Sequence, residues 1–186
     1  MFYSATPELG VRKIDVLNRQ DDPSCWVVVP VAPGVALYFA ILNEQTGSLG
    51  RIIAALTGSP AYHVETWLDD PYSSKMSDFA ESRLGEPYDF EGALLAWKDT
   101  GFHVQGHEFC SGFAYEILKQ ILQGLQPYPN PGKLLSQVPA MVGLPTPRLS
   151  MPTIEIGDIE YDYLQSLVPD KIATGTIQEV AERLQM

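Results

Sequence analysis

One cysteine in this sequence stands where a loop passes into an amphipathic helix, a position suited to a nucleophile. After Cys110, apolar residues recur on one helical face and a glycine closes the run, at Phe113, Ala114, Ile117, Leu118, Ile121, Leu122 and Gly124. A thiol in the first helical turn lies at the positive end of the helix dipole, which stabilises its reactive thiolate form. A lone cysteine is more often a small core residue. Cys110 is therefore a candidate nucleophile only in combination with other groups.

A thiol nucleophile needs a base beside it and a third group that orients the base. His63 is the candidate base, because it opens a β-type segment over residues 62–68 and a strand is a rigid support for an imidazole. Taken alone, His63 is more often an ordinary core or surface histidine. The hypothesis of a catalytic pair rests on its combination with Cys110.

The third group is predicted from strand geometry. If residues 69–74 turn and residues 76–82 return as the second strand of a hairpin, Glu81 lies opposite His63. Side chains that face each other on such strands have Cβ atoms about 4.5–5.5 Å apart, within reach of a carboxylate–imidazole contact. Glu65 is the alternative: it shares a face with His63 but lies about 6.5–7 Å further along the strand. A slip in register brings Ser82 into play instead.

The remaining histidines raise the possibility of a zinc site. His103 and His107 have the spacing that places two ligands on one face of a helix. Gly101 and Gly106 disfavour a helix there, and only His63 stands out as a further ligand. We therefore predict no metal and no cofactor, and the sequence also lacks a glycine-rich phosphate loop.

Composition bounds the class of protein. The chain has 186 residues, a net charge of −11 and a pI near 4.5, which argues against nucleic-acid partners. Cys25 and Cys110 leave room for one disulfide but not for a disulfide framework. We expect no signal peptide and no transmembrane segment, and hence a cytoplasmic protein, or one associated with virions or the host cytoplasm if it is phage-encoded.

The elements that position these residues are predicted from hydrophobic periodicity and turn signals. We expect strands at 26–29, ending at Pro30, and at 35–42, and helices at 48–56, 90–99, 159–167 and 176–184. The expected organisation is a loosely organised N-terminal arm (1–24), an α+β catalytic domain (25–136), and a proline-rich linker with a helical C-terminal extension (137–186).

The order of these motifs carries a family resemblance. Three segments follow one another, at 57–65 around His63, at 85–90 with Tyr88-Asp89-Phe90, and at 109–112 with Cys110. The sequence over 35–136 resembles the circularly permuted papain-like cysteine amidases of the NlpC superfamily, which include relatives of lecithin retinol acyltransferase. Gly112 departs from the family pattern, which has a glutamate there, and Ala61 stands where a serine is usual.

The resemblance implies a permuted papain-like core, in which the cysteine-bearing helix packs on an antiparallel sheet. It implies a thiol hydrolase of amide, ester or thioester bonds, with Cys110 as nucleophile, His63 as base and Glu81 at the third position. The backbone N–H of Cys110 and the Gln105 side chain would form the oxyanion hole. Family substrates are cell-wall peptides, lipid acyl groups and isopeptides.

Two other functions stay open at this point. One is a non-catalytic papain-like module for binding or assembly, which takes a protein partner through the proline-rich segment and C-terminal extension. The other, less favoured, is a zinc-binding protein that uses the histidines.

Overall fold

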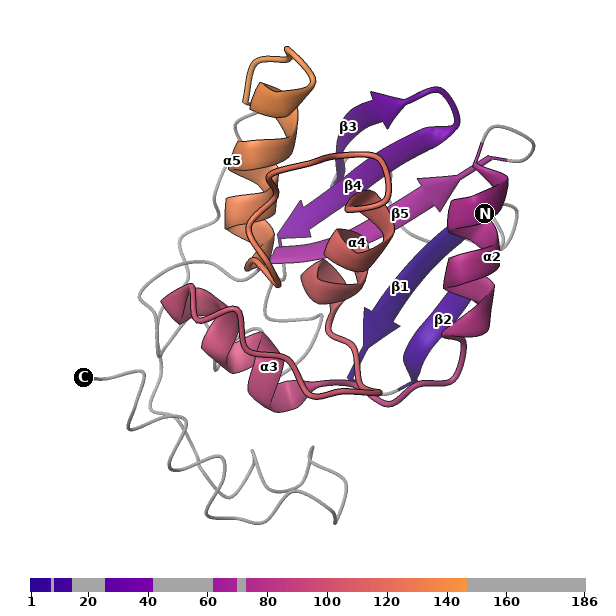
Figure 1. Cartoon of the computed structure of the whole chain (residues 1–186), viewed down its shortest axis with the longest axis vertical. Coiled ribbons are helices and arrows are strands. Elements are labelled where there is room, and N and C mark those ends of the chain that lie inside the picture. Colours follow the sequence, from indigo (N-terminus) through magenta and orange to yellow (C-terminus); the bar gives the residue numbers. More distant parts are fainter. Residues whose placement is uncertain (8, 15–25, 42–61, 70–72, 147–186) are drawn as a thin grey trace.

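The computed structural model of this chain describes residues 1–7, 9–14, 26–41, 62–69 and 73–146 (Figure 1). The described residues form β1 (Phe2–Thr6), β2 (Gly10–Ile14), β3 (Trp26–Ala32), β4 (Val35–Ile41), β5 (Tyr62–Leu68), α2 (Ser74–Ser82), α3 (Phe90–Leu95), the 3-10 helix η3 (Ala96–Lys98), α4 (Cys110–Leu118) and α5 (Pro131–Met141). The fold is α+β, and its strands form one antiparallel sheet in the order β2-β1-β5-β4-β3.

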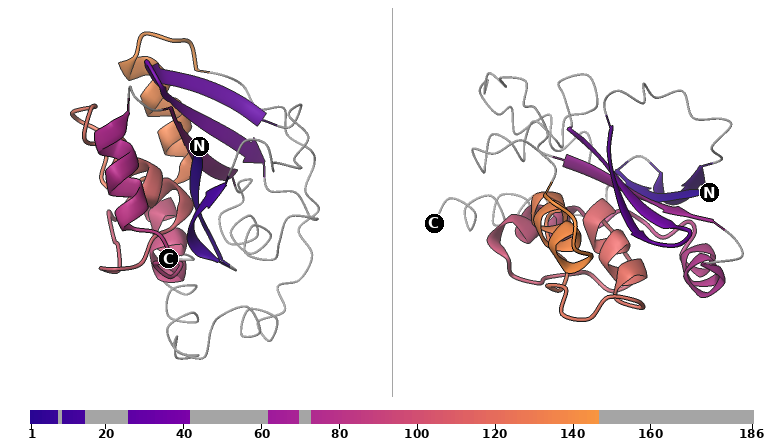
Figure 2. Two further views of the ribbon diagram at one scale, coloured as in Figure 1. Left: turned by 90° about the vertical axis from the view of Figure 1, so that its right-hand side faces the viewer. Right: turned by 90° about the horizontal axis from the view of Figure 1, so that it is seen from above.

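One face of the sheet carries the core. The strands alternate, so that Val35, Leu37 and Phe39 of β4 lie beside Leu68, Thr66 and Val64 of β5 in register. The aliphatic and aromatic members of this set are buried and pack with Phe113 and Ile117 of α4. The helices all lie against this same side of the sheet (Figure 2). The cysteine-bearing helix therefore packs on the sheet as the sequence predicts.

The central strand β5 pairs over different lengths with its two neighbours. β4 and β5 pair over seven positions, from Val35↔Leu68 to Ile41↔Tyr62. β1 and β5 pair at only two, Phe2↔Trp67 and Tyr3↔Thr66. Beyond Tyr3 the two strands diverge, and the N-terminal turn of α4 lies over this fork (Figure 1). The fork leaves the side chains of β1 and β5 accessible to the end of the helix.

The strands predicted at 35–42 and 62–68 are confirmed as β4 and β5. β3 runs through Pro30 to Ala32, where we expected the strand to end. The difference follows from position, because β3 is an edge strand and proline is tolerated where no ladder donor is needed. The pairing with β4 shifts register between Pro30 and Ala32, which accommodates the missing N–H.

The predicted hairpin partner of β5 is wrong. Residues 74–82 form helix α2, with Met76, Ser77 and Ala80 on its buried side. The segment holds no β-branched residue, and the buried residues Met76 and Ala80 have the i, i+4 spacing of a helix. The helical period of 3.6 residues therefore prevails over the two-residue alternation of a strand. Glu81 is consequently on a helix and not opposite His63.

The N-terminal region is also more ordered than predicted. Residues 2–6 and 10–14 are β1 and β2 of the central sheet, not a loosely organised arm. β1 is buried along its whole length. A short strand of this kind has little local signal, and its identity depends on a partner more than fifty residues later.

The helices differ from prediction mainly in their ends. The helix predicted at 90–99 appears as α3 followed by η3. α4 ends at Leu118, six residues before Gly124, and α5 crosses residue 136, where we expected the catalytic domain to end. The predicted helices at 48–56, 159–167 and 176–184 lie outside the described residues. No helix in the described ranges has the length and apolar character needed to cross a bilayer.

Gly10 lets β2 dock against the loop after α2. Its φ is +65°, and a Cβ built on it would lie 2.1 Å from the Glu86 carbonyl oxygen. Two backbone hydrogen bonds hold this contact, from Val11 N–H to Glu86 O (2.8 Å) and from Gly85 N–H to Val11 O (2.9 Å). Only glycine allows the two backbones to approach so closely.

We predict that Gly10→Ala lowers the free energy of unfolding by at least about 2 kcal/mol, because a left-handed backbone costs roughly 1–2 kcal/mol for an L residue and a backbone clash adds to it. Gly85→Ala is the matched control: its φ is +84°, but its Cβ position is open. Gly85→Ala should lower the free energy of unfolding only by the cost of the left-handed backbone, roughly 1–2 kcal/mol. Urea unfolding measures both, and equal losses would contradict the role of the close contact.

Candidate active site

A short parallel bridge aims the start of α4. Tyr88 and Glu108 form an isolated parallel β-bridge. Glu108 N–H donates to Pro87 O, and Asp89 N–H donates to Glu108 O, both at 3.0 Å. The segment before α3 and the segment before α4 therefore run side by side, and this contact determines where Cys110 enters the helix.

Cys110 is the first residue of α4. It is a free thiol, 7% exposed, and makes a side-chain hydrogen bond with His63. Phe109 is the N-cap and offers no side-chain acceptor to the first turn. The first backbone N–H groups of a helix have no partner within the helix, so donors in this turn are available to an anion at the thiol.

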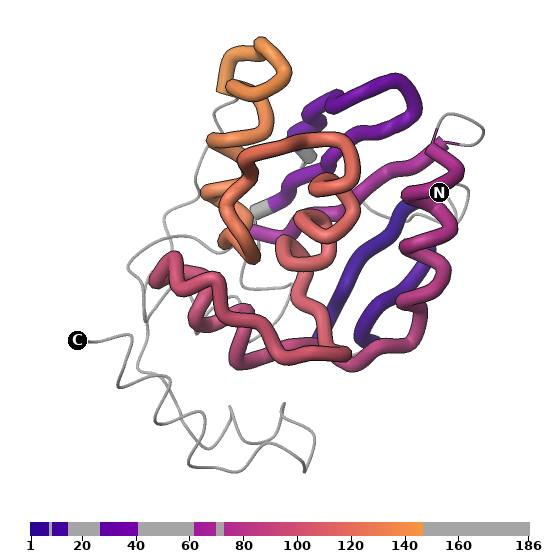
Figure 3. Tube along the Cα trace, viewed as in Figure 1, coloured from indigo at the N-terminus to yellow at the C-terminus, as the bar shows by residue number. Residues whose placement is uncertain are grey.

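Two groups from the sheet meet the other side of the imidazole. Nε2 of His63 lies 3.0 Å from Oγ of Ser4 on β1 and 3.4 Å from Oε1 of Glu65 on β5. With Nε2 engaged in this way, Nδ1 is the ring nitrogen left for Cys110. Figure 3 shows β1 and the start of α4 side by side although they lie far apart in the chain.

The electrostatics of this group favour a charged imidazole. Burial lowers the pKa of His63, but hydrogen bonds to Cys110 and Glu65, together with the negative charge of both, outweigh burial and raise the pKa from 6.5 to about 9. Glu65 is 2% exposed, so its charge acts with little screening by water. The arrangement favours a protonated imidazole at neutral pH beside the Cys110 side chain.

The sequence-predicted residues divide into two groups. Cys110, His63 and Glu65 come together, whereas Glu81 lies elsewhere. Glu81 accepts a hydrogen bond from the Tyr3 hydroxyl at 2.7 Å and pairs with Lys13. These two contacts lower its pKa. Ser82, the other register alternative, donates to Phe79 O at 2.6 Å.

The loop before α4 carries the two remaining histidines, His103 and His107. No group of three or more metal-ligating side chains occurs within the residues that the structure describes. His107 lies with Nδ1 3.5 Å from the Gln105 carbonyl oxygen, and Gln105 is exposed. Gln105 as a second oxyanion donor stays a prediction.

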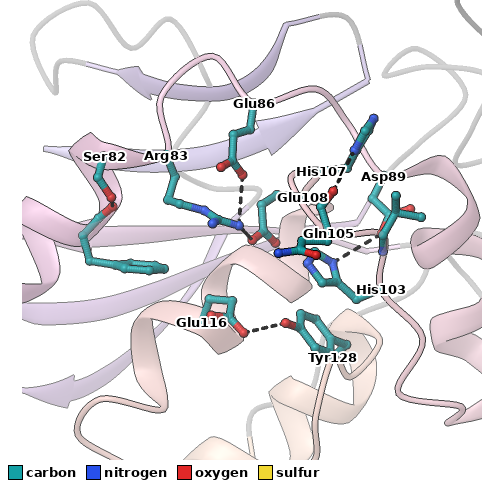
Figure 4. A network of polar contacts seen from close by, with 12 residues as sticks. Ser82, Arg83, Glu86, Asp89, His103, Gln105, His107, Glu108, Glu116 and Tyr128 are labelled. Atoms are coloured by element: carbon teal, nitrogen blue, oxygen red, sulfur yellow. Dashed lines mark hydrogen bonds and ion pairs between the residues drawn. The ribbon is translucent and has the colours of Figure 1, made fainter.

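A polar cluster forms around Glu108, just before the start of α4. Arg83 bridges two carboxylates, at 2.7 Å from Oε1 of Glu108 and 3.0 Å from Oε2 of Glu86 (Figure 4). Glu108 is fully buried. Burial raises its pKa to about 7, although the hydrogen bond and charge of Arg83 oppose the shift. This carboxyl, two residues before Cys110, titrates near neutrality.

The same cluster continues across α4. The Tyr128 hydroxyl donates to Oε1 of Glu116 at 2.7 Å, and its ring stacks on His103 at 4.2 Å between centroids. His103 Nδ1 lies 3.4 Å from Oδ2 of Asp89, which also accepts from Val104 N–H at 2.8 Å. Burial is the main cause of the lowered pKa of His103. The sequence made His103 a candidate zinc ligand, and in the structure its ring stacks on Tyr128.

One residue beside the candidate base, Ser4, escaped sequence analysis. It carried no local signal, because its partner is 59 residues away in the chain.

Searches of the sequence against protein-family models and curated proteins, and of the structure against solved structures, return no match. The family resemblance therefore stays a prediction from the sequence motifs.

We predict that stability falls as pH rises from about 4.5 to 7, owing to Glu108. Its folded pKa of about 7 lies above the ordinary 4.5, so the folded state binds the proton more tightly. The stabilisation is complete below pH 4.5 and is lost as the pH rises through 7, by roughly 3 kcal/mol. Glu108→Gln should remove this segment of the pH profile in urea unfolding.

Two comparisons sharpen that measurement. The fall at higher pH, from 6.5 through about 9, comes from His63 and should survive in Glu108→Gln. Glu86→Gln removes the other carboxylate on Arg83 and should keep the lower segment. A profile for Glu108→Gln identical to wild type would show that Glu108 does not titrate in this range.

Proposed function

We propose that this protein is a thiol hydrolase of amide, ester or thioester bonds, with a permuted papain-like catalytic core. The observation that carries the proposal is the hydrogen bond between Cys110, at the first turn of α4, and a buried His63 that also contacts Glu65. Nucleophile, base and orienting group in contact are the set that thiol hydrolysis needs.

The proposed reaction proceeds through an acyl-enzyme. The Cys110 thiolate attacks the carbonyl carbon, and the developing oxyanion is stabilised by backbone N–H groups at the start of α4. The imidazolium of His63 gives its proton to the leaving amine, alcohol or thiol as that bond breaks. His63 then takes a proton from water as that water attacks the thioester. Collapse of this second intermediate releases the acid and restores the Cys110 thiolate beside the imidazolium.

Glu65 is the third catalytic group in this proposal, in place of Glu81. A carboxylate beside Nε2 keeps Nδ1 facing the thiol and stabilises the positive charge on the ring. The long strand spacing that argued against Glu65 is offset by the bend of the two side chains toward each other, which brings Nε2 and Oε1 to 3.4 Å. Glu81, bound to Tyr3 and Lys13, supports β1 instead.

We predict that iodoacetamide alkylates Cys110 rapidly at neutral pH, because the imidazolium of His63 stabilises the thiolate. His63→Ala should slow the reaction about tenfold or more near neutrality and confine it to alkaline pH, as for an ordinary thiol. Peptide-resolved mass spectrometry separates Cys110 from Cys25, and Cys110→Ala gives the background. Equal alkylation rates in wild type and His63→Ala would contradict the proposed hydrolase and favour the non-catalytic binding module.

We predict further that Glu65→Gln lowers the pKa of His63 from about 9 toward 6.5, because it removes one of the charges that raise it. Glu81→Gln is the matched control and should leave this pKa unchanged, since Glu81 contacts Tyr3 and Lys13. NMR titration of the His63 ring, assigned by loss of its signal in His63→Ala, measures both. The reverse result would restore Glu81 as the third residue.

Metal analysis addresses the remaining alternative. Zinc bound stoichiometrically to protein purified without added metal, and lost in His103→Ala, would favour a zinc-binding protein. The proposal of a thiol hydrolase expects full alkylation reactivity after treatment with a chelator.

A further inference from the structure

Ser4 is a buried polar neighbour of the candidate base. It lies at the centre of β1, is 1% exposed, and its Oγ is 3.0 Å from Nε2 of His63. Tyr3 and Ala5, its neighbours in the strand, belong to the helix-covered core. Alternation therefore turns Ser4 to the other face, the face that His63 and Glu65 share.

The fork in the sheet makes this contact possible. β1 and β5 pair through Tyr3↔Thr66 and no further. Past that point the strands diverge while Ser4 remains next to the ring. Hydrogen bonds from Tyr3 and Lys13 to Glu81 hold β1 and β2 against α2. Ser4 is thus held at a defined position from the side opposite Cys110.

We propose that Ser4 is a positioning residue that holds the His63 ring toward Cys110 in both protonation states of the imidazole, a role that rests on the proposed function. A serine hydroxyl both donates and accepts. It accepts from Nε2–H of the imidazolium, and equally from Nε2–H of the neutral ring that remains after Nδ1 has given up its proton. The hydroxyl carries no charge, so it holds the ring without the preference for the imidazolium that a carboxylate has.

In this proposal, Ser4 and Glu65 each supply one part of the role that a third catalytic residue usually has: orientation of the imidazole and stabilisation of its positive charge. The Ser4 contact, at 3.0 Å, has ordinary hydrogen-bond length, whereas Glu65 at 3.4 Å is beyond the usual range for N–H···O bonds of about 2.7–3.2 Å. Glu65 raises the affinity of the ring for its proton, through a longer hydrogen bond and through its negative charge. Ser4 acts mainly through geometry, which keeps Nδ1 directed at the thiol.

The test compares the rate of Cys110 alkylation with the titration midpoint of His63. Ser4→Ala should slow alkylation by iodoacetamide at neutral pH about tenfold, the factor for one hydrogen bond to a charged group, and leave the midpoint of the His63 ring in NMR near 9. Glu65→Gln should move the midpoint itself. Ser4→Thr, which restores the hydroxyl, should recover most of the rate.

Thr6→Val is the matched control. Thr6 lies two residues further on the same strand and face and is 8% exposed, and its Oγ1 has no hydrogen-bond partner within the described residues. Valine keeps its shape and removes the hydroxyl. Thr6→Val should react like wild type. Thermal unfolding of each variant checks that the fold is intact at the assay temperature.

Three results would overturn the proposal. One is a wild-type alkylation rate in Ser4→Ala. Another is a fall of the His63 midpoint in Ser4→Ala as large as that in Glu65→Gln, which would make the effect electrostatic. The third is equal slowing in Thr6→Val, which would make it a general effect of β1. Failure of the proposed function gives a different result, because His63→Ala would then leave the alkylation rate of Cys110 unchanged.

Discussion

The contact between the first turn of α4 and the fork of the sheet is the constraint on which the rest of this structure depends. A helix packed squarely on a continuous sheet meets only the face that it covers, and His63 belongs by alternation to the opposite face from Val64. Because β1 leaves β5 after two residue pairs, the helix end and the far face meet at this one place. The apolar core anchors the body of α4, and the fork brings its N-terminus to the imidazole.

Polar groups around that contact are arranged in two shells with opposite electrostatic character. Next to the thiol, Glu65 favours a positive imidazole and raises its pKa. Behind it, Arg83 neutralises part of a carboxylate cluster in which Glu108 holds its proton up to about pH 7. Buried carboxylates surround the start of α4, where the positive helix end lies nearest.

Local sequence signals were sufficient for part of this site. The position of Cys110 at a helix start and of His63 on a strand follow from periodicity that spans only a few residues. The third residue did not follow, because it depended on whether residues 74–82 return as a strand or as a helix. Ser4 could not be found at all, since nothing in a five-residue buried strand indicates which distant strand it pairs with.

The division of the site between the two ends of the fold has a kinetic consequence. Ser4 comes from β1, His63 from β5, and Cys110 from α4, a helix that follows the five described strands in the chain. Contacts so distant in sequence form late, because loop closure must precede them. A nascent or partly folded chain therefore carries an ordinary thiol. In the proposed enzyme, an activated cysteine is a property of the completed fold, and its reactivity reports that these distant strands and the helix have come together.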